Sequence, residues 1–92
     1  MARRITGRPR AERPGQGNIL ATFGANLKAA RLKSGLTQAQ LAEATGLLQQ
    51  YISLVESGRQ NVTLTTAQVL ATAVNRDVRA LLARPRRRPF KG

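Results

Sequence analysis

The sequence contains neither cysteine nor histidine, and only 4 of its 92 residues are acidic. The lack of thiols and imidazoles excludes a disulfide framework, the usual zinc clusters and the commonest general base. The acidic residues are also too scattered along the chain to form a catalytic carboxylate pair. They are Glu12, Glu43, Glu56 and Asp77. We therefore expect a protein that is not an enzyme and that holds no metal and no cofactor.

Long apolar runs are also missing, and no stretch approaches the length of a membrane-spanning helix. The cations near the N-terminus are not followed by an apolar segment before residue 19, so a secretory signal is not supported. These absences lead us to expect a soluble, cytoplasmic protein.

Positive charge, by contrast, is abundant. The chain has 16 Lys and Arg against 4 Asp and Glu, which gives a formal net charge of +12. This imbalance favours a polyanionic partner, because Lys and Arg displace condensed counterions from phosphate groups. Nucleic acid is the first candidate partner, and an anionic membrane surface is the second.

The distribution of charge and of apolar residues divides the chain into three parts. Residues 1–18 hold five Arg and one Glu together with Pro and Gly, which is the composition of a flexible basic arm. Residues 83–92 hold five cations, two Pro and no acid, and form a second basic tail. Residues 19–82 contain nearly all the Leu, Ile and Val. We expect one folded domain there, because the chain is too short for two independent cores.

Apolar residues in this domain recur every three or four positions, which is the spacing of one helix face. The expected helices are 23–34, 38–45, 48–57, 64–74 and 78–82. The side chains expected to be buried are Phe23, Leu27, Ala30, Leu36, Leu41, Ala42, Ile52, Val55, Leu64, Leu70 and Ala71, with Leu32 as a further candidate. No segment alternates with period two for long enough to form a strand, so the expected fold class is all-α with five helices.

Capping and turn residues fall between these helices. Thr37 followed by Gln40 is a capping box, in which each side chain bonds to the other residue's backbone. The other expected N-caps are Thr22, Thr63 and Asp77. Helix ends are expected at Gly35, Gly46, Gly58 and Asn75, because glycine and asparagine best tolerate the left-handed backbone conformation.

Residues 36–58, LTQAQLAEATGLLQQYISLVESG, resemble the helix-turn-helix of the lambdoid phage repressors and Cro proteins. This Cro/CI-type (XRE) family also includes antitoxins and the controller proteins of restriction-modification systems. The resemblance runs from about Phe23 to Leu82. The matching features are Arg31, Gly-Leu-Thr-Gln at 35–38, Leu41-Ala42, Gly46, Ile52-Ser53, Glu56 and Gly58. It implies a five-helix, lambda-repressor-like DNA-binding domain.

Two residues depart from the family pattern. Leu48 stands where the family usually has Ser or Thr at the start of the recognition helix, so a side-chain cap is lost. Val62 stands where the family often has Pro. Neither position reads bases in the family scheme.

The resemblance implies that the helix after Gly46 lies in the major groove of DNA with its first residues at the base edges. These residues are Gln49, Gln50 and Tyr51. A Gln amide donates and accepts together, which suits N6 and N7 of adenine. The alternative is that the two Gln are ordinary solvent-exposed helix residues.

Other residues match family positions with different roles. Gln38, Arg59, Gln60 and Asn61 match positions that contact the DNA backbone, although the last three also fit a solvated polar loop. Arg31 and Glu56 match a partly buried ion pair between the first helix and the end of the recognition helix, and their implied role is structural.

The basic tails have two interpretations. Gly7-Arg8-Pro9 is the centre of an AT-hook, whose arginine enters a narrow A·T minor groove, and the neighbouring arginines extend it. The minor-groove candidates are Arg3, Arg4, Arg8 and Arg10. The second interpretation is a disordered arm that adds affinity without sequence preference. The C-terminal RPRRRPF run fits the same role or the binding of an acidic protein partner.

We expect a homodimer, because one recognition helix reads too few base pairs and the family usually binds two-fold sites. The candidate interface residues are Val62, Val69, Val74, Val78 and Leu81. The alternative is that all five belong to the core.

The sequence as a whole predicts a bacterial or phage-type, nucleoid-associated transcriptional regulator that binds double-stranded DNA at a two-fold operator. One alternative is an antitoxin-like subunit that holds a protein partner and autoregulates through its helix-turn-helix. Another is an architectural protein without sequence preference, for which the glutamine pair would be superfluous.

Overall fold

The computed structural model describes residues 18–84 and contains five helices and no strand within them. The helices are α1 (Ile19–Lys33), α2 (Gln38–Thr45), α3 (Gln49–Glu56), α4 (Leu64–Ala73) and α5 (Val78–Leu82). The all-α, five-helix expectation is confirmed. The four arginines proposed for a minor-groove arm lie outside the described residues, as does the C-terminal basic run after its first residue, Arg84. None of the described helices is long and apolar enough to cross a membrane.

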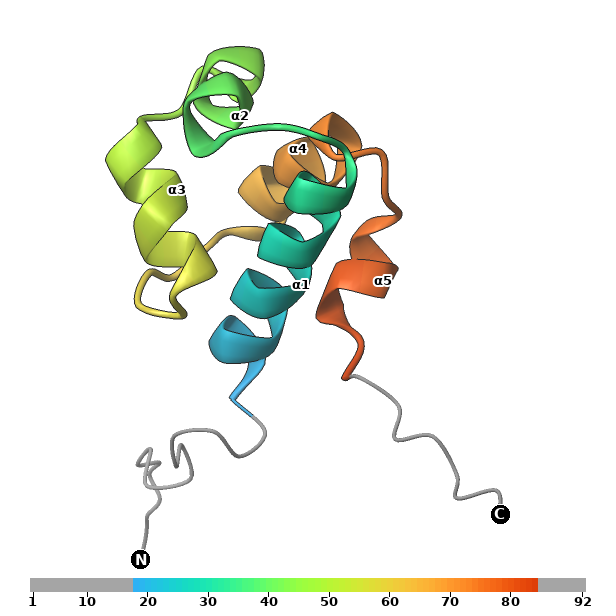
Figure 1. Cartoon of the computed structure of the whole chain (residues 1–92). Helices are drawn as coiled ribbons and strands as arrows, with labels where there is room; N and C mark the ends of the chain where they lie inside the picture. The colour runs from blue at the N-terminus through green and yellow to red at the C-terminus, as the bar shows by residue number, and fades with distance from the viewer. Residues whose placement is uncertain (1–17, 85–92) are drawn as a thin grey trace, which may run out of the picture.

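Helix α1 is the central element of the fold. It lies between α3 on one side and α5 on the other, and it packs against both (Figure 1). Helix α2 packs against α3 and α4, and α4 packs against α5. The helix-turn-helix formed by α2 and α3 therefore occupies one side of the molecule and is supported by α1 and α4.

The start of α1 differs from the prediction. Asn18 is its N-cap, and the side-chain oxygen of Asn18 accepts hydrogen bonds from the backbone N–H groups of Leu20 (2.8 Å) and Ala21 (3.4 Å). Thr22 lies within the helix. The helix begins four residues earlier than the apolar spacing indicated, because its first turn carries an exposed residue, Ile19, that adds nothing to the buried pattern.

The other predicted caps are confirmed. The hydroxyl of Thr37 accepts from the N–H of Gln40 at 3.0 Å, and the Gln40 side-chain oxygen accepts from the N–H of Thr37 at 2.9 Å. Thr63 caps α4 and Asp77 caps α5, and each side chain accepts one hydrogen bond from a backbone N–H of its helix. Gly46 ends α2 at φ 78°, in the left-handed region that L side chains rarely adopt.

The core is formed by one buried side of each helix. The buried apolar side chains are Phe23, Leu27, Ala30, Leu41, Ile52, Val55, Ala67, Leu70, Ala71, Val74 and Leu81. Leu32 and Leu64, expected in this core, are 58% and 79% exposed. Leu32 lies two residues after Ala30 and thus on another face of α1, and the buried face of α4 begins one turn after Leu64, at Ala67.

The predicted dimer residues divide into two groups. Val74 and Leu81 are only 1% and 2% exposed, so they belong to the core of one chain, and their assignment to an interface is wrong. Their burial follows from the packing of α4 and α5 against each other and of α5 against α1. Val62 and Val78 are partly buried against the core, and Val69 is 40% exposed.

Gly24 allows α1 to approach the end of α3 closely, a role that the sequence analysis missed. A Cβ atom at this position would lie 2.2 Å from the carbonyl oxygen of Val55 and 2.8 Å from that of Glu56. Both distances are shorter than van der Waals contact, and both partners are backbone atoms. Only glycine fits at this crossing.

We predict that Gly24→Ala destabilises the domain by about 3 kcal/mol, the upper end of the cost of overpacking a close-packed site. Alanine favours a helix over glycine by about 1 kcal/mol, so any loss must come from the clash. Thermal unfolding followed by circular dichroism measures the change. Ala25→Ser, at an exposed position of the same helix, is the control and should leave the midpoint nearly unchanged. An unchanged midpoint for Gly24→Ala would contradict the close approach.

Candidate nucleic-acid interface

The first turn of α3 presents two amide side chains to solvent. Gln49 and Gln50 are the first two residues of α3, and both are exposed. The start of α3 and the turn from α2 lie at the outer edge of the molecule, on the side away from α5 (Figure 1). The predicted base-reading glutamines are therefore accessible to a large partner without any change in the fold.

The N-cap of α3 lacks a side-chain hydrogen bond, as predicted from Leu48. Its backbone has the extended geometry of a cap, with φ −74° and ψ 143°, and its side chain is 75% exposed. The carbonyl of Leu48 still accepts the first helical bond, from the N–H of Ile52 at 3.1 Å. The helix start is thus formed, but its first amides are not satisfied by a cap side chain.

Tyr51 lies differently from the two glutamines. It is partly buried against the core, and its hydroxyl donates a long hydrogen bond of 3.4 Å to the carbonyl oxygen of Asn61. The side-chain amide of Gln60 donates to the same oxygen, also at 3.4 Å. The hydroxyl of Tyr51 and the amide of Gln60 thus both donate to one carbonyl oxygen of the loop between α3 and α4.

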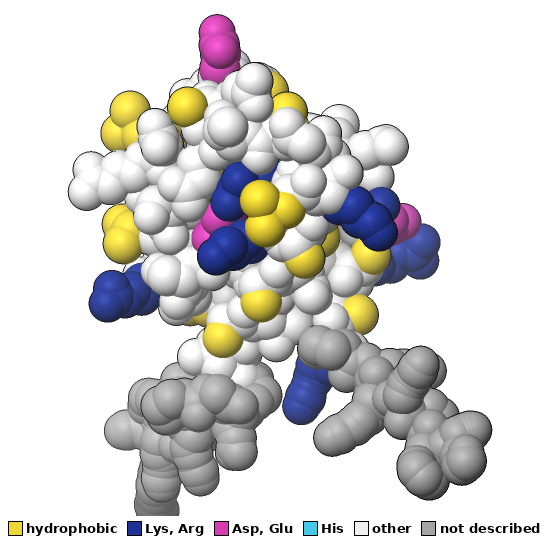
Figure 2. Space-filling model, viewed as in Figure 1, with side chains coloured by type: hydrophobic (Ala, Val, Ile, Leu, Met, Phe, Trp, Pro, Cys, Tyr) yellow, Lys and Arg dark blue, Asp and Glu magenta, His cyan; other side chains and the backbone are white. Residues whose placement is uncertain are grey.

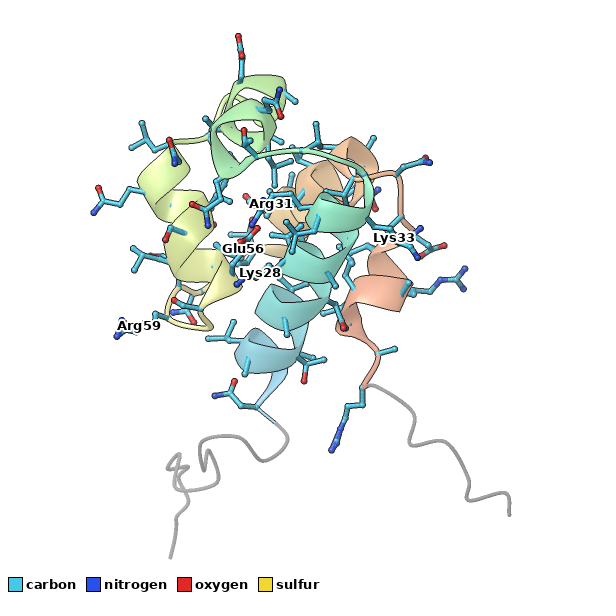
Figure 3. The ribbon with its side chains drawn as sticks, in the orientation of Figure 1. Lys28, Arg31, Lys33, Glu56 and Arg59 are labelled. Atoms are coloured by element: carbon cyan, nitrogen blue, oxygen red, sulfur yellow. The ribbon has the colours of Figure 1, made fainter. Side chains whose placement is uncertain are left out.

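Arg59 extends from the loop that follows α3. It is exposed, and its side chain points away from the body of the molecule (Figure 3). Its backbone N–H donates to the carbonyl oxygen of Leu54 at 2.9 Å, which fixes the chain at the end of α3. Within residues 18–84 no acidic side chain forms an ion pair with this guanidinium, which belongs to the loop directly after α3.

A buried ion pair joins α1 to the end of α3 (Figure 3). Nε of Arg31 lies 2.6 Å from Oε2 of Glu56, and Nη2 donates to Oε1 at 3.0 Å. Nη1 of Arg31 also donates to the carbonyl oxygen of Leu36 at 2.9 Å. The two side chains are only 8% and 4% exposed. The structure thus contains the pair that the family resemblance implied.

The Arg31 guanidinium is held in its charged form by this arrangement. The hydrogen bond to Glu56 raises the pKa of Arg31 above its ordinary value, and the charge of Glu56 acts in the same direction, whereas burial opposes both. A bidentate pair of this kind fixes the relative orientation of two helices as well as neutralising two buried charges.

Gln38, predicted as a phosphate contact, is bound to the same pair. Its side-chain Nε2 donates to Oε1 of Glu56 at 3.0 Å, and the residue is half-buried at the first turn of α2. One N–H of this amide is used in that bond, and the other is available to a second acceptor. Gln38 therefore connects the ion pair to the surface on which α2 begins.

Positive charge outweighs negative charge on the domain. Two of the three acidic residues in the described part of the chain, Glu56 and Asp77, are in ion pairs with Arg31 and Arg79. Figure 2 shows one face of the molecule, on which Lys and Arg side chains occupy several separate places. Such a surface attracts a polyanion.

This fold and this site together define a helix-turn-helix DNA-binding domain. The helix-turn-helix family model matches residues 27–81, more than half of the chain. The chain belongs to the XRE-type helix-turn-helix family of DNA-binding transcriptional regulators. The relatives described below are named as regulators and not as enzymes.

Individual relatives agree with this assignment. The control protein C.SmaI from Serratia marcescens is 46% identical over 59 residues, which cover 64% of this chain and 70% of that protein. The crystal structure of the restriction-modification controller protein C.AhdI from Aeromonas hydrophila superposes with a TM-score of 0.64 at 40% identity, over 67% of this chain and 94% of that one. SinR, a master regulator of biofilm formation solved in complex with DNA, gives a TM-score of 0.63 at 26% identity, over 66% and 98% of the two chains.

We predict that Glu56→Ala destabilises the domain by about 3 to 5 kcal/mol, because it leaves the buried guanidinium of Arg31 unpaired. For a domain of this size that loss lowers the melting temperature by well over ten degrees, at roughly 4 to 8 °C per kcal/mol. Differential scanning calorimetry measures it. Arg79→Ala, which breaks the exposed pair with Asp77, is the matched control and should have little effect. A loss of only a degree or two for Glu56→Ala would contradict a structural role of the pair.

Proposed function

We propose that this chain is a sequence-specific transcriptional regulator that binds a two-fold DNA operator as a homodimer, with α3 in the major groove. The observation that carries the proposal is the pair of exposed amides at the first turn of α3, on a helix whose other end is fixed by a buried ion pair. Gln49 and Gln50 then read bases, and adenine is the base that an amide pairs with in a bidentate manner. Each such contact discriminates by about 1 to 3 kcal/mol.

Phosphate contacts flank the two readers in this proposal. The free N–H of the Gln38 amide and the first turn of α2 face one strand, and the exposed guanidinium of Arg59 faces the other. Gln60 and Asn61 belong to the same loop as Arg59. Tyr51 keeps this loop in place through the Asn61 carbonyl and approaches the bases only if that long bond opens.

The homodimer rests on geometry and on the remaining apolar surface. One recognition helix reads only a few base pairs, whereas two helices about one turn of DNA apart read a palindrome. Of the five apolar residues predicted for the interface, Val69 is the most exposed. Val62 and Val78 are partly buried against the core, and in this proposal their exposed atoms add to the dimer interface around Val69.

The base-reading proposal is tested by selection on randomised duplex DNA at fixed, near-physiological salt, because affinity depends strongly on salt. We expect a two-fold motif to be enriched. For the winning duplex, the Gln49→Ala, Gln50→Ala double variant should lose at least about tenfold of its preference over a scrambled duplex but keep its affinity for the scrambled one. Fluorescence anisotropy measures both affinities.

Two results would contradict the proposal. If no motif is enriched and binding simply follows charge, an architectural role or an antitoxin-like subunit that holds a protein partner becomes the better explanation. If a motif is enriched but the double variant keeps its full preference, the bases are read by residues other than the glutamines.

We predict that Val69→Asp shifts the chain from dimer to monomer in sedimentation velocity, because a carboxylate replaces an apolar side chain at the proposed contact. Operator affinity should fall with it, since two half-sites are no longer bound together. Leu32→Asp, at an exposed apolar position of α1, is the control. A Val69→Asp chain that remains a dimer would remove α4 from the interface.

A further inference from the structure

The exposed side chain of Leu48 does not belong to the buried core of the domain. It is 75% exposed, whereas its neighbour Leu47 packs against the core. As the N-cap of α3 it makes no side-chain hydrogen bond, although Ser, Thr, Asn or Asp at this position would satisfy a free amide of the helix. The chain thus has a large apolar group where both the solvent and the helix favour a polar one.

The position of Leu48 relative to the base readers is well defined. Its backbone is held by the bond from Ile52 N–H to its carbonyl oxygen, and it directly precedes Gln49. A polar cap side chain would be turned toward the amides of its own helix, whereas the leucine side chain has no such bond and projects into solvent. Leu48 and the two glutamines are therefore exposed together at the start of α3, and this end of α3 lies at the outer edge of the molecule (Figure 1).

The major groove offers few apolar groups for such a side chain. Base edges there present hydrogen-bond donors and acceptors, and the apolar exception in unmodified DNA is the C5-methyl group of thymine. We propose that Leu48 contacts the C5-methyl group of a pyrimidine, thymine in unmodified DNA, next to the base pair that Gln49 reads. This inference rests on the function proposed above, because it requires α3 to lie in the major groove.

The contact explains why the cap is missing. Removal of a leucine side chain and a methyl group from water is favourable, whereas a serine at this position would gain a bond within the protein and lose the apolar contact. Burial of one methyl group changes affinity by about fourfold. That gain depends on one particular base, so Leu48 contributes to sequence preference and not to general affinity.

The test is a deoxyuridine scan of the duplex selected by the full-length chain. Each thymine is replaced in turn by deoxyuridine, which removes only the C5-methyl group and keeps every hydrogen-bonding group of the base. For the wild type we expect one thymine in each half-site whose replacement weakens binding by about fourfold. For Leu48→Ser the loss at that position should fall to nearly none, while the other positions behave as in the wild type.

The design separates a loss of contact from a loss of fold. Leu48→Ser supplies an N-cap, so its melting temperature should rise. Leu32→Ser, which removes an exposed leucine from α1, should keep the full deoxyuridine effect. A second series carries cytosine or 5-methylcytosine at the sensitive position. If the wild type binds the 5-methylcytosine duplex more tightly than the cytosine duplex and Leu48→Ser does not, the contact accepts the methyl group of either pyrimidine. If the wild type binds both duplexes equally, the contact is restricted to thymine.

Three outcomes would overturn the inference. The first is that no thymine is sensitive in the wild type, and the second is that Leu48→Ser keeps the sensitivity. The third is that Leu48→Ser lowers the sedimentation coefficient, which would place Leu48 in a protein interface. These outcomes differ from a failure of the proposed function, in which no preferred duplex is selected or the glutamine variant keeps its preference.

Discussion

The buried pair of Arg31 and Glu56 is the interaction on which the arrangement of the helix-turn-helix depends. Two charges that are 8% and 4% exposed are tolerated only because each satisfies the other, so neither side chain can move without a large cost. The pair also engages the carbonyl of Leu36 and the amide of Gln38, which lie just before and at the start of α2. One cluster thus fixes α1, the entry to α2 and the end of α3 together.

The same end of α3 is held a second time, by a steric constraint. Gly24 places the backbone of α1 against the carbonyls of Val55 and Glu56, so the residue that carries the carboxylate also forms the close backbone contact. The opposite end of α3 has no side-chain cap and presents exposed residues, Leu48 to Gln50. A recognition helix built in this way has a rigid C-terminal anchor and a free N-terminal surface, which suits the reading of bases by preorganised side chains.

The features predicted correctly from the sequence are those decided by near neighbours in the chain. The capping box of Thr37 and Gln40, the turn at Gly46 and the left-handed Asn75 depend on residues within a few positions, and the structure has all three. The Arg31–Glu56 pair came from the family resemblance, since nothing local joins residues 25 positions apart. Burial that depends on tertiary packing was predicted less well. The role of Gly24 and the burial of Val74 follow from which helices cross and where, and apolar spacing along one helix does not contain that information.

Gln38 connects this structural cluster to the proposed DNA surface. Its amide donates one N–H to Glu56, and in the proposed complex its second N–H donates to a phosphate. A phosphate bound there would lie close to the ion pair, and the amide of Gln38 would then donate one N–H to each of two anionic groups. The cations, by contrast, are concentrated in residues 1–18 and 83–92, which precede α1 and follow α5. In the proposed complex, much of the affinity for phosphate would come from these segments, in addition to the phosphate contacts of the domain, and added salt should weaken this affinity far more than the preference for a base sequence.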